Sequence, residues 1–147
     1  MFLQARRFIW EINGDGKDAE LSKAIRAAMP EMGEMRPTYV VAEAMYWRKA
    51  NAIHRWFVDN VQNGKDDCGT YPVTREQLGA LVQACRNVLD NRESAAEILP
   101  TSSGFFFGGT GYDGWYWTKV QDTADGLERL LNDPNLREWR FEYHSSW

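Results

Sequence analysis

Alternation of apolar and polar residues predicts strands near both ends of the chain. Every second residue is apolar in two segments, near the start at Phe8, Trp10 and Ile12 and near the end at Trp139, Phe141 and Tyr143. The first strand should end at the turn-forming residues 13–16. Residues 38–41 are rich in β-forming side chains and predict a second strand, and residues 105–107 predict a short strand or extended segment. The polar stretch 65–73 predicts a loop.

Between these segments, apolar residues recur every three or four positions, which predicts helices. The predicted helices span residues 18–29, 44–61, 74–91 and 116–132, with one more helical turn at 93–99. The stripe of the second helix consists of Tyr46, Ala50, Ile53, Phe57 and Val61. Thr74 and Gln77 have the spacing of a capping box. The pattern indicates a single α+β domain over residues 1–147, with a small, mostly antiparallel sheet of three or four short strands against about three helices.

The composition fits one globular domain with a single core, and its aromatic content stands out. Of 147 residues, 44% are hydrophobic and 26% are charged, which excludes a disordered tail, a collagen-like repeat and a disulfide-dense miniprotein. Seven Trp, seven Phe and six Tyr are present. None of them lies between Tyr71 and Phe105, and eleven follow residue 100. The rings therefore form two patches, separated by a helix that is expected to be scaffold.

The charge balance and the cysteines exclude several partners. Seventeen Lys and Arg against 21 Asp and Glu give a net charge of −4 without a basic stripe, so duplex nucleic acid is not an expected partner. Cys68 and Cys85 lack CxxC spacing and only two His are present, so we expect no metal site, no cofactor and reduced thiols. No apolar run approaches the ~18 residues of a membrane span, and a signal-peptide core is missing. We expect no membrane partner and a cytoplasmic location.

Candidate chemistry is densest in residues 46–57. On a continuous helix, a second stripe would run beside the apolar one through Trp47, Asn51, His54 and Val58. Such an indole, amide and imidazole can hold a planar or polar ligand, and His54 can act as a general base or donor near neutral pH. In the alternative, Trp47 and Trp56 flank the core while Asn51 and His54 form hydrogen bonds to another element.

Charged residues around this segment offer weaker candidates. Arg48 and Arg55 lie on a more exposed face and can receive phosphate or carboxylate, although solvated helix charges are favoured. Asp59, Asp66 and Asp67 are of the type that holds Mg²⁺ with substrate phosphates, but they lack a DxD pattern. A solvated loop is the favoured interpretation of these acids. The chain has no GxSxG elbow and no Ser-His-Asp order.

The glycine-rich segment after residue 103 is the second candidate. Gly109, Gly111 and Gly114 satisfy GxGxxG spacing, but too little chain follows Leu131 for the ~30-residue βαβ unit of a dinucleotide fold. A tight turn explains the glycines better. This turn would expose three aromatic side chains suited to an interface, Tyr112, Trp115 and Trp117. Packing of these rings against the final strand in the core is the alternative.

Several short strings carry a family resemblance. They are YWRKANAIHRWFV at 46–58, DC at 67–68 with Tyr71, LPT at 99–101, GFFFG at 104–108, YD at 112–113 and the ending YHSSW at 143–147. Together they resemble a family of small, mostly uncharacterised bacteriophage and prophage proteins, over residues 40–147. The chain departs from it at the N-terminus and in the glycines of 108–114. The resemblance implies a phage origin and a host-cytoplasm setting rather than a chemistry. It brings forward Trp47, Arg48, Lys49, Asn51, His54 and Trp56.

We expect a phage accessory protein that acts by binding, with a surface that combines residues 47–54 and 112–117. Its partner would be a host protein, such as a defence effector, or the small nucleotide signal that a defence system makes. One alternative is a small enzyme acting on a nucleotide or nucleic acid, with His54 as acid/base and Arg48 or Lys49 on phosphate. Another is a phage structural or assembly protein. The sequence leaves the oligomeric state open.

Overall fold

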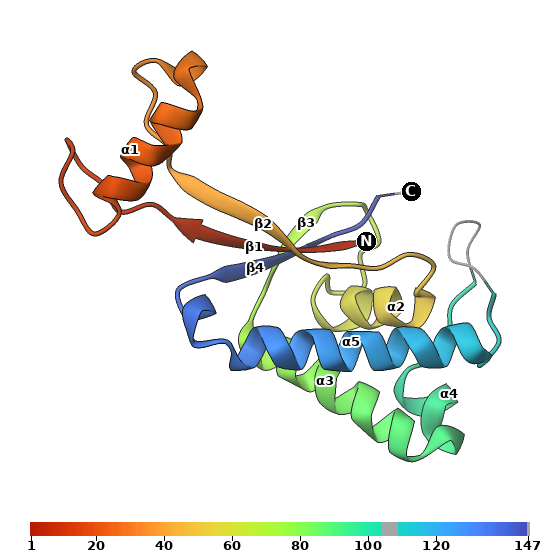
Figure 1. Cartoon of the computed structure of the whole chain (residues 1–147). Helices are drawn as coiled ribbons and strands as arrows, with labels where there is room; N and C mark the ends of the chain where they lie inside the picture. Colours follow the sequence, from red (N-terminus) through yellow and green to blue (C-terminus); the bar gives the residue numbers. More distant parts are fainter. Residues whose placement is uncertain (104–108, 147) are drawn as a thin grey trace.

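The computed structural model describes residues 1–103 and 109–146, so the predicted strand at 105–107 lies outside the described residues. Four antiparallel strands form one sheet in the order β2-β1-β4-β3 (Figure 1). They are β1 (Phe2–Phe8), β2 (Tyr39–Tyr46), β3 (Thr70–Val73) and β4 (Arg140–His144). The helices are α1 (Ala19–Ala28), α2 (Asn51–Asn60), α3 (Arg75–Asp90), α4 (Ala95–Ile98) and α5 (Gly114–Asn132). The predicted α+β fold class is therefore confirmed.

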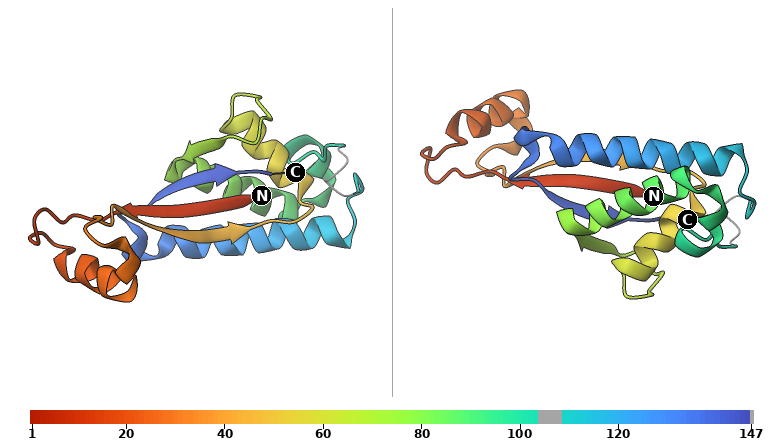
Figure 2. Two further views of the ribbon diagram at one scale, coloured as in Figure 1. Left: turned by 90° about the horizontal axis from the view of Figure 1, so that it is seen from above. Right: turned by 90° about the horizontal axis from the view of Figure 1, so that it is seen from below.

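One face of the sheet and three helices build the core. Alternate residues of β1 and β4 are buried, as the period of two along a strand requires: Leu3, Ala5, Phe141 and Tyr143. The helices oppose them with a layer that includes Ile53, Phe57, Leu78, Leu81, Cys85, Val120 and Leu127. Figure 2 shows α3 and α5 side by side beneath the sheet. Burial raises the pKa of the Cys85 thiol to about 12, so this sulfur stays protonated within the core.

The segment from residue 38 to residue 61 differs from the prediction of a helix over 44–61. β2 continues to Tyr46, which pairs with Phe2 of β1, and α2 begins only at Asn51. Pairing with β1 satisfies the backbone N–H and C=O groups that this edge strand turns toward β1, and this gain outweighs a helical periodicity that is compatible with both structures. Trp47 therefore does not share a helix with Asn51.

Two other boundaries also differ. β1 occupies residues 2–8, so the alternation at residues 8–12 marks the end of a strand and a turn with an isolated bridge between Ile12 and Asp15. β3 lies inside the predicted loop 65–73. Its proline, Pro72, cannot donate to a ladder, which is tolerated because β3 is an edge strand.

The start of α3 follows the prediction. Thr74 Oγ1 accepts a hydrogen bond from the Gln77 backbone N–H at 3.1 Å, and Gln77 Oε1 accepts one from the Thr74 N–H at 2.9 Å. The two bonds complete the capping box, which satisfies two backbone donors at the helix end. The helices predicted at 18–29 and 116–132, and the strand at the end of the chain, are also confirmed.

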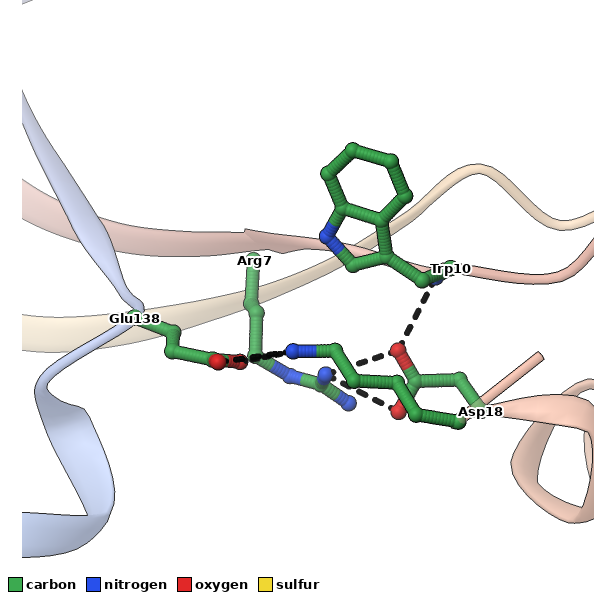
Figure 3. A network of polar contacts seen from close by, with 5 residues as sticks. Arg7, Trp10, Asp18 and Glu138 are labelled. Carbon is green, nitrogen blue, oxygen red and sulfur yellow. Dashed lines mark hydrogen bonds and ion pairs between the residues drawn. The ribbon is translucent and has the colours of Figure 1, made fainter.

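Residues 9–38 leave the sheet between β1 and β2 as an arm that carries α1. Figure 1 shows the arm beyond the end of the sheet, on the side away from α3 and α5. Asp18 anchors it to β1, because its carboxylate accepts hydrogen bonds from the Arg7 guanidinium at 3.0 and 2.9 Å and from the Trp10 backbone N–H at 2.9 Å (Figure 3). The Trp10 N–H and the Arg7 charge lower the pKa of Asp18, so the anchor stays ionised at neutral pH.

Polar contacts also hold the inside of the arm together. Glu11 is buried, and its carboxylate accepts from the Gly14 N–H at 2.6 Å and from Ser22 Oγ at 3.1 Å. A second tie to the body joins Lys17 Nζ to Glu138 at 2.6 Å (Figure 3). The arm thus depends on a few polar groups, whereas α3 and α5 depend on an apolar seam.

Candidate functional site

Trp47 lies in the core, at the turn that leads from β2 into α2. Its side chain is 2% exposed, its ring centre lies 5.6 Å from that of Phe57, and its Nε1–H donates to Thr123 Oγ1 of α5 at 2.9 Å. The indole therefore fastens β2 to α5. The expectation that Trp47 contacts a ligand does not fit this burial, because the described structure covers its ring on all but a small fraction of its surface.

His54 is also buried, with 2% of its surface exposed. Nδ1 lies 2.7 Å from the hydroxyl of Tyr143, and Nε2 lies 3.2 Å from Oδ2 of Asp66. A carboxylate accepts only, so Nε2 carries the hydrogen and the Tyr143 hydroxyl donates to Nδ1. Burial lowers the pKa of His54, partly offset by Asp66. A general base needs access to a substrate, and this imidazole is enclosed.

The contacts of His54 with the exposed Asp66 and the buried Tyr143 are a finding that the sequence did not reveal. The Tyr143 ring stacks on Phe57 with centres 3.9 Å apart, and burial raises the pKa of its hydroxyl. Asp66 is an exposed acid of the loop after α2, as predicted, and its carboxylate also contacts His54. The arrangement joins α2, this loop and β4 through one imidazole.

The remaining residues of the first motif differ in their exposure. Asn51 is buried, but its Nδ2 donates to the Gly109 carbonyl at 2.9 Å, which ties α2 to the segment before α5. Arg48 is exposed, and Trp56 is half-buried with its ring edge-on to Phe57 at 5.4 Å. Lys49 is exposed and has a φ of +54°, a left-handed backbone that a lysine adopts only at a cost.

The second aromatic patch opens α5. Asp113 caps this helix, with its Oδ1 accepting from the N–H groups of Trp115 and Tyr116 at 3.0 and 3.1 Å. The Trp117 Nε1–H donates to the Tyr112 carbonyl at 3.0 Å, and the Arg92 guanidinium lies 4.7 Å from the Trp117 ring centre. Because Asp113 already uses these helix donors, they are not presented to a phosphate as in a GxGxxG loop.

Trp115 brings the two motifs together. Its indole is 51% exposed, and its Nε1–H donates to the Lys49 carbonyl at 3.1 Å. The ammonium of Lys119, one turn along α5, lies 4.6 Å from the centre of the ring. Trp115 and Lys119 are four residues apart, so helical spacing alone was a signal for their contact, although the sequence analysis did not single out Lys119.

These groups surround a cavity of about 320 Å³ between the turn before α2 and the start of α5. We call it the Trp115 cavity. It is lined by Lys49, Ala50, Asn51, Ala52, Gly109, Gly111, Asp113, Trp115, Tyr116, Lys119 and Val120. Its walls are mainly an aromatic ring, small apolar side chains and backbone. Two lysines also line it, and the ammonium of Lys119 lies between the Trp115 ring and the carboxylate of Asp122. Such a cavity suits a planar ligand that carries negative charge.

The cavity offers little for proton transfer. Tyr116 donates its hydroxyl to the Leu99 carbonyl at 2.9 Å, and burial raises the pKa of that hydroxyl, so it stays protonated. Asp113 serves as the helix cap, and neither His54 nor Trp47 lines the cavity. Of the predicted site residues, the structure thus gathers Lys49, Asn51 and Trp115 in one place.

Comparisons with protein families, with curated proteins and with solved structures gave no match to this chain. Within residues 1–103 and 109–146, no three His, Cys, Asp or Glu side chains cluster as ligands for a metal ion. In the same part of the chain, no helix combines the length and the apolar character needed to cross a bilayer.

Proposed function

We propose that this protein acts by binding, and that the Trp115 cavity captures a small ligand of the nucleotide class. One observation carries the proposal: a half-exposed indole, fixed by its own N–H to the Lys49 carbonyl and contacted by the Lys119 ammonium, forms the wall of a cavity that both lysines line. A planar base can stack on the indole, and a phosphate can approach Lys49 and Lys119.

The construction of the cavity supports capture by a preformed site. Trp115 is held by its hydrogen bond to Lys49, and Asn51 holds the opposite wall through the Gly109 carbonyl. Preorganised side chains lose little entropy when a ligand binds, which favours affinity. Stacking of one base on an aromatic side chain is worth about 1–3 kcal/mol by alanine substitution, so Trp115 should be the main contributor.

Binding without turnover is the version of the proposal that the chemistry favours. Among the described residues of the cavity, the ionisable groups are two lysines, a capping aspartate and a tyrosine that is bonded to Leu99. An enzyme acting through His54 would need the core to open around that ring. The resemblance to phage proteins supplies the setting that we propose, an accessory protein that antagonises a host defence by withholding its nucleotide signal.

A binding experiment with mass readout tests this function. The purified protein is incubated with cyclic and linear nucleotides, the complex is separated by gel filtration, and the ligand released by denaturation is weighed. We expect one nucleotide class to be retained at unchanged mass. A retained ligand of altered mass would support the alternative of a small enzyme instead, and no retention of any nucleotide would reject the proposal.

A pair of variants tests whether the ligand binds at the Trp115 cavity. Trp115→Ala should lower affinity about tenfold, because about 1.4 kcal/mol corresponds to a tenfold change. Trp10→Ala is the matched control, since that indole is similarly exposed, at 57% against 51%, and lies in the arm at the other end of the molecule (Figure 1). Equal affinities of the two variants would remove the Trp115 cavity from the proposal even if a ligand is retained.

A further inference from the structure

The face of the sheet that turns away from α3 and α5 carries large side chains that remain exposed. We call it the open face. Its positions follow from the register, in which Arg6 pairs with Val41 on one side and with Arg140 on the other. Tyr39, Val41 and Tyr46 of β2 are 45%, 54% and 52% exposed. Exposed aromatic and apolar side chains in this number on one sheet face mark an interaction surface.

Two ring clusters lie at opposite ends of β1 on this face. At the arm end, the Phe8 ring packs edge-on against Trp10 and Tyr39, with centres 5.0 and 5.2 Å apart. At the other end, the Phe2 ring contacts Tyr46 at 5.2 Å and His144 at 6.3 Å. The first cluster borders a hollow of about 590 Å³, lined by Arg6, Arg7, Phe8, Trp10, Tyr39, Glu138, Arg140 and Glu142.

Charges of both signs lie between the two clusters. Arg6 Nη1 donates to Glu142 Oε1 at 2.8 Å, and the Arg6 guanidinium also lies 4.1 Å from the centre of the Tyr39 ring. Arg140 stands two residues before Glu142 on β4, so both side chains point to the open face. No described carboxylate pairs with Arg140. The face thus combines a paired acid with an exposed, unpaired base on the same strand.

We propose that the open face binds the open face of a second copy of this chain, with a two-fold axis that crosses the strands at the level of Ala5 and Phe141. This rotation reverses each strand on itself, so Arg140 of one copy lies over Glu142 of the other, and the reverse contact also forms. It also brings the ring cluster at Phe2 over the hollow beside Trp10. Two-fold contacts of this kind are self-complementary, as a homodimer requires.

The arm fits the same arrangement. It stands beyond the end of the sheet, on the side of the open face (Figure 1). In the proposed dimer each arm therefore reaches past the Phe2 end of the other copy. Three of its apolar side chains are exposed, Ile12, Met29 and Met35, at 67%, 45% and 60%. Sheets that pack face to face keep their strands within about 30° of each other, which preserves these pairings.

The distribution of charge favours a second copy of this chain over a polyanion as the partner of the open face. Acidic and basic side chains share the face, with Glu43 and Glu142 beside Arg6 and Arg140, and the chain as a whole carries a net charge of −4. A nucleic-acid surface needs an excess of positive charge, whereas alternating signs are matched by the same surface rotated onto itself.

Sedimentation velocity over a range from low to high micromolar protein tests the proposal. We expect the full chain to form a dimer whose dissociation constant rises at least tenfold in Arg140→Glu, because that change places like charges opposite each other at two positions. Arg129→Glu, on the exposed side of α5, is the matched charge reversal and should leave the dimer unchanged.

Mixing two variants gives the sharper result. Glu142→Arg should weaken the dimer in the same way, while an equimolar mixture of Arg140→Glu and Glu142→Arg should dimerise, since both facing pairs of residues 140 and 142 then have opposite signs. Thermal unfolding verifies that each variant is folded. Trp10→Ser, made in the otherwise unchanged chain, removes a ring of the hollow without altering charge and should also weaken the dimer. A monomer at all concentrations, or a dimer insensitive to both Arg140→Glu and Trp10→Ser, would overturn the proposal.

Discussion

His54 lies between two polar partners, and in the neutral ring their chemistry selects one tautomer. The Tyr143 hydroxyl can donate to Nδ1, and the Asp66 carboxylate, 3.2 Å from Nε2, favours the hydrogen on that nitrogen. From the sequence, the choice between a core imidazole and a ligand-binding one could not be made, because both use the same residue on the same helix face. Asp66 and Tyr143, which decide it, lie 12 and 89 residues along the chain from His54.

The lowered pKa of His54 predicts that stability falls in mild acid. Below the ordinary imidazole pKa of 6.5, the unfolded chain binds a proton that the native imidazole resists. The unfolded state then holds more protons, so the free energy of unfolding decreases as the pH falls, by at most about 1.4 kcal/mol per pH unit. Urea unfolding at several pH values between 6.5 and 5 measures this slope, above the range near ~4 in which unfolded carboxyls titrate.

Two histidine variants isolate the effect. His54→Gln should lose most of the slope. It should also lower the stability at pH 7, because the buried hydrogen bond between His54 and Tyr143 is disrupted. His144→Gln, at the only other histidine of the chain, should retain the slope of the wild type. The assignment would be contradicted by a slope that persists in His54→Gln and disappears in His144→Gln.

Replacing Lys49 should change stability and nucleotide binding in opposite directions. Its left-handed backbone costs an L-residue roughly 1–2 kcal/mol but costs glycine nothing in sterics, while glycine gains chain entropy in the unfolded state. Lys49→Gly should therefore raise the free energy of unfolding by up to about 1 kcal/mol and yet weaken nucleotide capture. Arg48→Gly is the control for stability, since Arg48 does not have a positive φ and the change should destabilise. Denaturant melts and the binding assay together check both effects.

At the scale of elements, the sequence predicts those helices and strands that depend mainly on interactions between residues close together in the chain. The helix over α3 could be predicted because Thr74 and Gln77 form its cap and its apolar spacing extends over four turns. The boundary between β2 and α2 could not, because residues 44–50 fit a helical period and only the distant β1 selects the strand. β3 was missed for a similar reason, since four residues with Pro72 look like a loop until β4 supplies a partner.

The capping box of α3 predicts a measurable loss on its removal. Thr74→Ala leaves the Gln77 N–H without its acceptor, and a lost N-cap costs about 1 kcal/mol. Thr74→Ser keeps an oxygen in the same place and should restore most of the stability. Chemical denaturation of the three proteins gives the values. Equal stabilities of the alanine and serine variants would show that the cap contributes nothing to the folded state.

At the scale of the whole molecule, the chain consists of parts with different sources of stability. The body has an apolar layer between the sheet and α3 with α5. The arm instead buries polar groups, among them Glu11, Asp18 and Ser22. Ile9 is fully buried at its base, and the other large apolar residues of the arm are half-buried or exposed. Regions with few buried apolar contacts open at lower free energy than the global transition. The arm should therefore open separately from the body.

Hydrogen exchange followed by mass spectrometry tests this separation. Amides of α1 should exchange faster than those of α3 and α5, and Glu11→Ala should accelerate exchange in the arm while the melting temperature of the body changes little, because Glu11 contacts only arm residues in its polar network. Leu81→Ala is the contrasting variant: it leaves a cavity in the seam between α3 and α5 and should cost about 2–5 kcal/mol. If Glu11→Ala lowered protection in α3 and α5 as much as in α1, the arm and the body would be one cooperative unit. A dimer through the open face would slow exchange in the arm with rising protein concentration, so the same measurement also reports whether the arm contacts a second copy.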